Sequence, residues 1–361
     1  MDISKEEEIR ALEIHSKAII INGLDPTKLD AFSDDYIQDL KKGGFTGICF
    51  SLISPEETVS LSQAVRQVAD SYLRFRDLGP DKVKLTMTVR EIKEAKEKGR
   101  IAVIFSSQGS GYLEFNLSNI EVFHKLGMRI MQPTYQRRNQ FGDGCAEKKD
   151  AGLSNLGINW VEEMNRLHML ISLSHVGFRS SMEVMEISKD PVIFSHANPR
   201  ALCSHVRNIT DEQIKACAEK GGVIGLLPLA SFLRDDKGPR EIGLSDYLDH
   251  VAYMVNLVGV DHVGFGVDLP TGWFFTPVEI LERRRKYPEM RPPRLREVED
   301  EFLKSGRERL AFYEVQAPWF SSMTQMPMVT KGLVAKGYSD EEIVKILGGN
   351  FLRVFGKVWG S

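Results

Sequence analysis

The chain has 361 residues, with 47 Lys and Arg against 50 Asp and Glu and a formal net charge of −3. This slightly acidic balance argues against a nucleic-acid partner held mainly by electrostatics. The hydrophobic share of 42% is enough for a large soluble core.

Cysteine usage and the N-terminal sequence indicate a reducing compartment. The four cysteines, Cys49, Cys145, Cys203 and Cys217, have no C-x-x-C spacing, which favours reduced thiols over a disulfide framework or a zinc ribbon. The N-terminal residues are charged and lack the apolar core of a signal peptide. No run approaches the roughly 20 apolar residues needed to span a bilayer. We therefore expect a cytoplasmic protein without a membrane partner.

Short apolar runs alternate with helical patterns along most of the chain, as strands and helices do in α/β folds. The expected strands are 18–23, 45–51, 101–107, 128–135, 170–175, 191–196, 221–228 and 261–268. The expected helices are 4–17, 35–42, 55–78, 91–98, 119–126, 158–168, 210–220 and 244–257. This alternation predicts a (β/α)8 TIM barrel rather than a doubly wound open sheet.

Two segments interrupt this alternation. Residues 83–89 alternate like a strand, but a better strand follows at 101–107, so we interpret 83–89 as an added segment. Residues 136–157 carry little helical or strand signal. Loops of that length inside a compact domain are usually functional or disordered, and this one follows a strand, so we expect a lid or a substrate wall.

The C-terminal third adds elements to the barrel. Residues 272–318 are rich in Arg, Glu and Pro, which predicts a helical insertion; an oligomer contact through it, as in a homodimer, is left open. Residues 338–358 predict a C-terminal helical extension, and Ser339 with Glu342 forms the capping-box pattern that starts it. We expect all of 1–361 to form one barrel domain.

Two histidines mark the ends of successive expected strands. The run LISLS ends in His175 and the run PVIFS ends in His196. Neighbouring parallel strands lie about 4.8 Å apart, and active sites of such barrels lie at the C-terminal strand ends. The alternative is two independent histidines, each bound to a backbone carbonyl. Their repetition favours one shared site that binds a metal or performs catalysis.

Longer motifs carry a family resemblance. The segments EEMNRLHMLISLSHVG, SHANPRALCSHVRN, DHVGFGVD and GYSDEEIVKILGGNFLRVF resemble the renal or membrane dipeptidase family of the amidohydrolase superfamily, over roughly residues 18–357. The resemblance implies a (β/α)8 barrel, a two-zinc centre and hydrolysis of small dipeptides. It also implies that His175 and His196 bind the second zinc ion, that Arg207 holds the substrate carboxylate and that Asp268 handles the catalytic proton.

Other positions depart from the family pattern. Where the family has an H-x-D pair for the first zinc ion, this chain has Leu24 and Pro26, with Asp25 between them and expected to point elsewhere. Gln108 lies at or near the position of the glutamate that bridges both ions, and Tyr135 replaces a substrate-contacting histidine. A zinc site normally needs three or four strong ligands.

These substitutions predict a reduced site in a dipeptidase-like hydrolase that acts on a small carboxylate-bearing peptide or amide. We expect at most one zinc ion, with none as the alternative, held by His175, His196 and Asp268. The expected catalytic residues are Asp268, Tyr135 and Gln108, the last two as donors to an oxyanion. Arg207 and Tyr135 are the expected substrate-binding residues, because a planar guanidinium suits a carboxylate.

Two alternatives stay open. One is a catalytically degenerate protein that only binds a small carboxylate. The other is an enzyme of metal-free proton transfer, with Asp268 or a histidine as base and Tyr135 as acid. Retention of polar groups at the strand ends favours an active enzyme. The substrate itself depends on loop geometry and is not defined by the sequence.

Further polar residues are expected to be structural or solvated. His205 is expected to brace Arg207, and His262 to lie at the opposite end of the barrel. The loop charges expected to face solvent are Asp143, Glu147, Arg137 and Arg138. The alternatives are that Asp143 and Glu147 reach the site and that Arg137 and Arg138 add positive charge for an anionic substrate.

Overall fold

Eight parallel strands form the centre of the protein in the computed structural model, which describes residues 3–53, 59–234, 241–269, 271, 274–291, 293–311 and 319–360. One sheet contains, in spatial order, β1 (Ile21–Asp25), β2 (Gly47–Ile53), β4 (Ile101–Ser107), β5 (Met128–Met131) and β6 (Leu170–Ile171). A second sheet contains β7 (Ile193–Phe194), β8 (Val223–Leu226) and β9 (Val263–Phe265). These are the eight strands that the sequence predicts.

The two sheets join at both edges into a barrel. On one side Ser172 and Ile193 form a parallel bridge between β6 and β7. On the other side the Asp268 amide donates to the Leu24 carbonyl at 3.2 Å. The Asn22 side chain, at 2.8 Å, accepts a hydrogen bond from the amide that precedes Asp268. The closed arrangement confirms the predicted TIM-barrel fold class.

The added segment is also confirmed. Strand β3 (Val83–Leu85) pairs in parallel with the beginning of β4, with Val83 opposite Ile101, and lies off the path of the barrel strands. The longest ladder joins β2 to β4, from Gly47 opposite Ala102 to the ends of both strands.

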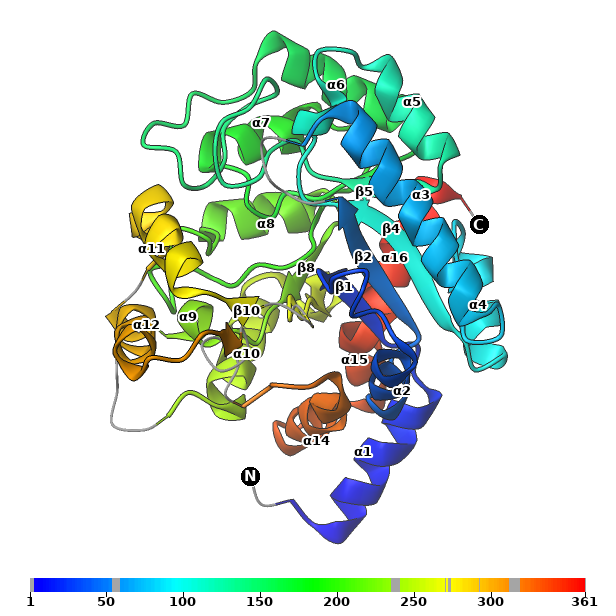
Figure 1. The fold of residues 1–361 in the computed structure, drawn as a ribbon. Coiled ribbons are helices and arrows are strands. Elements are labelled where there is room, and N and C mark those ends of the chain that lie inside the picture. The colour runs from blue at the N-terminus through cyan, green and yellow to red at the C-terminus, as the bar shows by residue number, and fades with distance from the viewer. Residues whose placement is uncertain are drawn as a thin grey trace.

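Helices form the outer layer (Figure 1). In chain order they are α1 (Lys5–Lys17), α2 (Asp34–Lys42), α3 (Leu61–Leu78), α4 (Val89–Glu97), α5 (Ser118–Lys125), α6 (Asn155–Arg166), α7 (Phe178–Ile187), α8 (Asp211–Glu219), α9 (Ala230–Leu233) and α10 (Leu244–Val258). Single 3-10 turns occur at Gly111–Leu113, Val260–His262, Pro288–Met290 and Met323–Gln325. Hydroxyl caps define where helices begin: Ser60 and Thr210 each form a capping box with a glutamine three residues later.

Some predicted bounds shift. The two expected strands that carry the histidines keep only two ladder residues each, in β6 and β7, because the backbone turns soon afterwards and His175 has φ +68°. Helix α6 begins at Asn155 rather than at 158, because Ser154 caps it. Part of the expected helix 55–78 lies outside the described residues, and α3 covers Leu61–Leu78.

The C-terminal helices close the bottom of the barrel, which is the end at which its strands begin. After α14 (Met326–Ala335), the chain forms α15 (Asp340–Val344), a π-helical turn (Lys345–Gly349) and α16 (Asn350–Trp359). Phe351 and Phe355 of α16 share a core cluster with apolar side chains from seven of the barrel strands, two of them from β4; these are Ile21, Cys49, Ala102, Ile104, Ile130, Leu170, Ile193 and Val223. A Cβ at Gly348 would lie 2.3 Å from the Ile19 carbonyl oxygen, so glycine is required for this close approach.

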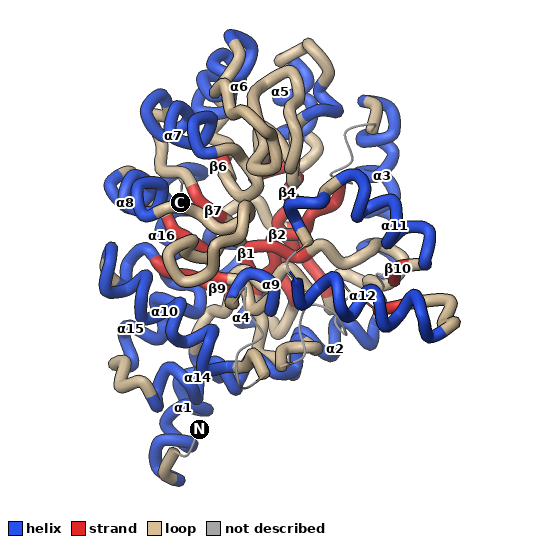
Figure 2. The backbone as a smooth tube through the Cα atoms, turned by 90° about the vertical axis from the view of Figure 1, so that its left-hand side faces the viewer, coloured by secondary structure: helices blue, strands red, loops and turns tan. Residues whose placement is uncertain are grey.

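The expected insertion contains α11 (Pro277–Lys286), α12 (Pro293–Ser305) and an antiparallel pair, β10 (Phe274–Phe275) with β11 (Leu310–Ala311). Ile280, Leu295, Phe302 and Leu310 form its small core. Figure 2 shows α9, α11 and α12 in front of the barrel strands, on the side that Figure 1 shows at the left. Positions 270, 272–273, 292 and 312–318 lie outside the described residues, and the single-domain organisation stays a prediction. Within the described ranges, every helix is too short or too polar to traverse a bilayer.

Candidate active site

The two strand-end histidines meet inside the barrel. The Nε2 atoms of His175 and His196 are 2.9 Å apart, and their rings are 4.9 Å apart between centroids. Both side chains are buried. Burial, together with the nearby charge of Arg207, lowers the pKa of each imidazole well below its ordinary value. The pair is therefore neutral at pH 7, with one ring donating a hydrogen bond and the other accepting it.

A row of polar side chains lies behind His196. The Ser195 hydroxyl is 2.9 Å from His196 Nδ1 and 2.9 Å from the Ser172 hydroxyl, which lies 3.2 Å from Gln132 Oε1. The Ser174 hydroxyl accepts from the His196 amide at 2.9 Å. Sequence patterns did not predict a role for these residues. The feature that could have indicated one is the serines within the two apolar runs. Their contacts orient His196 and leave its Nε2 facing His175.

Arg207 is the central charge of the site. Its side chain is only 3% exposed. Its Nη2 donates to the His196 carbonyl at 3.1 Å, and its guanidinium lies 5.9 Å from the centroid of the Phe232 ring. No carboxylate of the described residues comes within ion-pair distance. Buried charges are normally paired with an opposite charge, so an anionic ligand would stabilise this guanidinium.

His205 braces this arginine, as the sequence predicts. Its Nδ1 accepts from the Arg207 amide at 3.1 Å, and its ring packs on Phe232 at 4.7 Å between centroids. Burial, assisted by the charge of Arg207, lowers the pKa of His205 to about 4. His205 is therefore neutral and structural. His262 is structural too, with Nδ1 2.9 Å from the Gly222 carbonyl oxygen.

Asp268 follows β9 with a left-handed backbone, φ +49°, and is half-buried. Burial raises the pKa of its carboxyl to about 7; the charge of Arg207 opposes this rise and that of Asp25 adds to it. A carboxyl of this kind can both accept and return a proton near neutral pH. A non-glycine residue held at positive φ is also a feature of functional sites.

Tyr135 completes the group around the histidines. Its ring lies on that of His175, with centroids 4.1 Å apart and planes 32° apart. Burial raises the pKa of the phenol, assisted by the charge of Asp268, so the hydroxyl stays protonated and can donate. Gln108 is buried after β4, and its Nε2 donates to the Ser51 hydroxyl at 3.2 Å. Within the described residues, no hydrogen bond joins Gln108 to Arg207 or to either histidine.

The substituted ligand positions on β1 are closed to a metal. Leu24 is 2% exposed and belongs to the core. The Asp25 carboxylate accepts from the Tyr36 hydroxyl at 2.5 Å and from the Thr27 amide at 3.0 Å, and so faces α2. Across the described ranges, no three His, Cys, Asp or Glu side chains are grouped to hold a metal ion. The residues present therefore do not fit a two-zinc centre.

The long loop after β5 forms a fixed wall beside the histidines. The Cys145 amide donates to the His175 carbonyl at 2.7 Å, and Gly144 pairs with Val176 in an antiparallel bridge. The expectation that Asp143 faces solvent is wrong: it is 1% exposed and forms an ion pair with Arg138. A carboxylate inside a loop is stable when it is bound in this way.

Arg137 is also not a solvated charge. Its Nη2 lies 2.8 Å from Glu289 and donates to the Lys286 carbonyl at 2.7 Å. Glu147 is partly buried and accepts from the Arg138 amide at 3.0 Å. Arg137 thus ties the wall of the site to the insertion.

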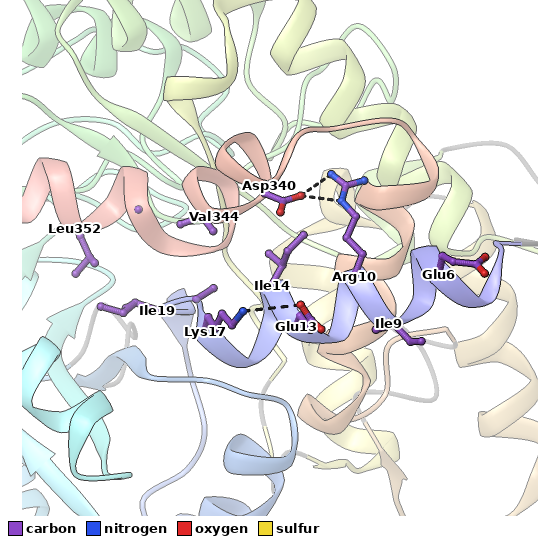
Figure 3. Close-up of a pocket in the computed structure, with 12 residues that line it drawn as sticks. Glu6, Ile9, Arg10, Glu13, Ile14, Lys17, Ile19, Asp340, Val344 and Leu352 are labelled. Atoms are coloured by element: carbon purple, nitrogen blue, oxygen red, sulfur yellow. Dashed lines mark hydrogen bonds and ion pairs between the residues drawn. The ribbon is translucent and has the colours of Figure 1, made fainter.

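A surface groove of about 560 Å³ lies elsewhere, between α1 and the C-terminal helices (Figure 3). Its lining includes Ile14, Ile19 and Leu352, and the ion pair between Arg10 and Asp340 spans 2.7 Å. None of the candidate site residues lines it. The groove is therefore separate from the chemistry at the other end of the barrel.

Comparison with known proteins gives one consistent family. The model for membrane dipeptidase, peptidase family M19, matches residues 11–299. Dipeptidase tcpJ of Claviceps purpurea is 26% identical over 296 residues, which are 81% of this chain and 59% of that protein. Dipeptidase aclJ of Aspergillus oryzae is 29% identical over 262 residues, 72% of this chain and 52% of that protein. The chain thus spans between half and three fifths of these curated relatives.

Solved structures give the same fold. The crystal structure of an amidohydrolase from Pseudomonas aeruginosa has a TM-score of 0.82 and 30% identity, over 97% of this chain and 99% of that one. The probable dipeptidase PvdM from the same organism has a TM-score of 0.77 and 21% identity, over 99% of both chains. This second likeness shows the barrel fold alone.

Proposed function

Because the chain belongs to the membrane dipeptidase family, peptidase family M19, we propose that it is a hydrolase of small peptides or amides that carry a free carboxylate. Its relatives are described as dipeptidases. We propose in addition that the site is reduced. Its own acid–base groups replace the two-zinc centre, for which the ligands on β1 are absent.

The observation that carries this proposal is the buried, unpaired guanidinium of Arg207. Among the described residues, its guanidinium donates a hydrogen bond to a carbonyl oxygen and lies over an aromatic ring, and it forms no ion pair. A substrate carboxylate would supply the missing negative charge through a bidentate pair, which is shorter and stronger than a neutral hydrogen bond. The adjacent histidines are neutral, because their pKa values are lowered, so they add no positive charge to that of Arg207.

Asp268 is the proposed proton acceptor. With a pKa of about 7, its carboxylate form is abundant at neutral pH and its acid form is accessible. In hydrolysis it takes a proton from a water molecule whose oxygen attacks the amide carbonyl. Tyr135 donates a hydrogen bond to the oxyanion that forms. The C–N bond then breaks, and Asp268 returns the proton to the leaving amine.

Gln108 is proposed as a second oxyanion donor. Its amide donates to the Ser51 hydroxyl, so its contribution is expected to be smaller than that of Tyr135. A single ion on His175, His196 and Asp268 is the metal-dependent alternative, although the described residues do not group these three side chains as a metal site. The steps proposed above do not use it.

A second candidate is proton transfer without hydrolysis. The 2.9 Å contact between His175 and His196 favours it, because each imidazole uses its site-facing nitrogen for the other ring. Asp268 would then remove a proton from the carbon beside the carboxylate that Arg207 holds, and Tyr135 would stabilise the product. The non-catalytic alternative is a protein that binds the carboxylate through Arg207 and performs no reaction.

The test is a panel of dipeptides and N-acyl amino acids, assayed with and without prior chelation of the protein. The proposal predicts cleavage that survives chelation and is lost in Asp268→Asn. Exchange of the α-hydrogen for deuterium without cleavage would support the second candidate instead. Cleavage abolished by chelation and restored by zinc would contradict the metal-independent site.

A further inference from the structure

Three consecutive arginines on α11 have different surroundings. Arg284 is structural: its guanidinium lies 2.6 Å from Glu299 and 2.7 Å from Asp300, which joins α11 to α12. Arg285 is exposed, and Arg283 is half-buried. Because helical neighbours point about 100° apart, the three side chains leave the helix in different directions. Arg283 therefore needs an explanation of its own.

Arg283 has no carboxylate at ion-pair distance among the described residues. Its guanidinium lies over the Phe275 ring, 5.1 Å from the centroid. Glu279, one turn earlier on α11, is occupied at the helix start, where its Oε2 accepts from the Thr276 amide at 2.8 Å. The aromatic platform orients the guanidinium and leaves its N–H edges available. Arg283 is thus a second fixed cation without a carboxylate partner, after Arg207.

The end of α11 is attached to the wall of the site. Arg137, two residues after Tyr135, binds the Lys286 carbonyl and Glu289, and its guanidinium lies 5.3 Å from the Tyr287 ring centroid. These contacts hold α11 beside the segment that carries Tyr135. The electrostatics agree: burial raises the pKa of Tyr135, and the charges of Arg283 and Arg207 both oppose that rise. Both arginines therefore act on the same part of the site.

We propose that Arg207 and Arg283 bind two separate negative groups of one substrate. The preferred substrates are then small peptides or amides with two carboxylates, one held deep in the barrel and one held by the insertion. This inference rests on the proposed function and adds the substrate class to it. Among the described residues neither cation has a carboxylate at ion-pair distance, and two such positive charges beside the half-buried Asp268 favour dianions over monoanions.

Two matched pairs of dipeptides test the proposal: Ala-Glu with Ala-Gln, and Glu-Ala with Gln-Ala. Within a pair the shape is nearly constant and only one carboxylate changes. Binding to the full chain is measured by isothermal titration calorimetry, with chromatography to verify that the dipeptide is intact. We expect the acidic member of at least one pair to bind about tenfold more tightly than its amide partner.

The variants assign that preference to one side chain. Arg283→Ala is expected to abolish it, Arg283→Lys to retain part of it, and Arg285→Ala, on the same helix, to leave it unchanged. Melting temperatures verify that each variant is folded. Equal binding within both pairs, or a preference that survives Arg283→Ala, would overturn the inference.

The neutral dipeptides test the proposed function separately. Ala-Gln and Gln-Ala each carry one terminal carboxylate, and their binding should depend on Arg207 and not on Arg283. If they bind and Arg207→Met weakens them while no acidic preference exists, the substrate class fails and the proposed function stands. If no dipeptide of either pair binds, both fail.

Discussion

The two ends of the barrel use the same strands for opposite purposes. At the bottom, apolar side chains from seven strands, β6 and β7 among them, pack in one cluster with Phe351 and Phe355 of α16. At the top, β6 and β7 continue into His175 and His196, and Asp268 follows β9. The nearby cation Arg207 has no carboxylate partner in the described part of the chain. The bottom is packed for stability. The top keeps a buried charge at a cost in stability, which the proposed carboxylate ligand would offset.

The largest expected effect breaks the closed end. Phe351→Ala removes a fully buried ring from the centre of the bottom core and should lower the free energy of unfolding by about 3–5 kcal/mol. The lost contacts are apolar and involve none of the candidate site residues. The folded fraction of the variant should therefore retain its affinity for carboxylate ligands. Chemical denaturation and calorimetry check the two quantities. A variant of wild-type stability would show that α16 does not close the core.

The next largest effect concerns the top of the barrel, where Arg207 lies. Arg207→Met keeps apolar bulk and removes the charge, so kcat/KM for a carboxylate-bearing substrate should fall about a hundredfold or more. The free energy of unfolding should stay equal or rise, because an unpaired buried charge is lost. This is the reverse of the pattern at Phe351. A large loss of stability in Arg207→Met would mean that the arginine has a structural role instead.

The end of the barrel that carries Asp268 should also be the pH-dependent one. Activity should rise as pH increases through about 7, because Asp268 must lose its proton to act as a base. Stability should change in the opposite direction. The folded-state pKa lies above the unfolded value of about 3.9, so the native protein binds the proton more tightly and loses that stability between about pH 4 and pH 7.

Asp268→Asn supplies the control for this prediction. Cleavage should be lost in this variant at every pH, and the fall in its melting temperature across the same interval should be flattened. Wild-type rates, and melting temperatures of both proteins at matched pH values, give these curves. A wild-type activity profile without a limb near pH 7 would exclude Asp268 as the base.

The smallest expected effect concerns the wall of the site. Arg138→Ala removes the ion-pair partner of the buried Asp143 and should lower the free energy of unfolding by about 1–3 kcal/mol. The exposed side of Arg138 makes the lower figure the better guide. Hydrogen exchange should show faster opening of the segment around Cys145, whose amide is bonded to His175. Unchanged exchange there would mean that the pair does not hold the wall.

Local patterns in the sequence predict the parts of this molecule that local physics decides. The eight strands occupy the expected runs, and the predicted capping box is confirmed, with Glu342 accepting from the Ser339 amide at 2.8 Å. The two histidines meet because equivalent strand ends converge in a parallel barrel. Each of these features depends on spacing within a short segment or on barrel geometry.

Long-range contacts decide the rest, and spacing alone does not show them. Asp143 is buried, and its amide donates at 3.1 Å to the Ser180 hydroxyl on α7, 37 residues away. Arg137 is partly buried because an insertion about 150 residues later supplies Glu289 and the Lys286 carbonyl. The two-residue lengths of β6 and β7 likewise depend on where each strand leaves its neighbours. Arg283 gave no sequence signal, because Arg284 and Arg285 beside it have the same side chain.

The metal content of the purified protein shows directly whether its site holds two zinc ions. Elemental analysis of the full chain, as purified and after incubation with zinc followed by desalting, gives the number of ions per chain. We predict one ion at most, because the family resemblance places Leu24 and Pro26 at the first pair of ligand positions and Gln108 at or near the position of the bridging carboxylate. Two tightly held zinc ions per chain would contradict it, and would return the protein to the two-metal chemistry that its family resemblance implies.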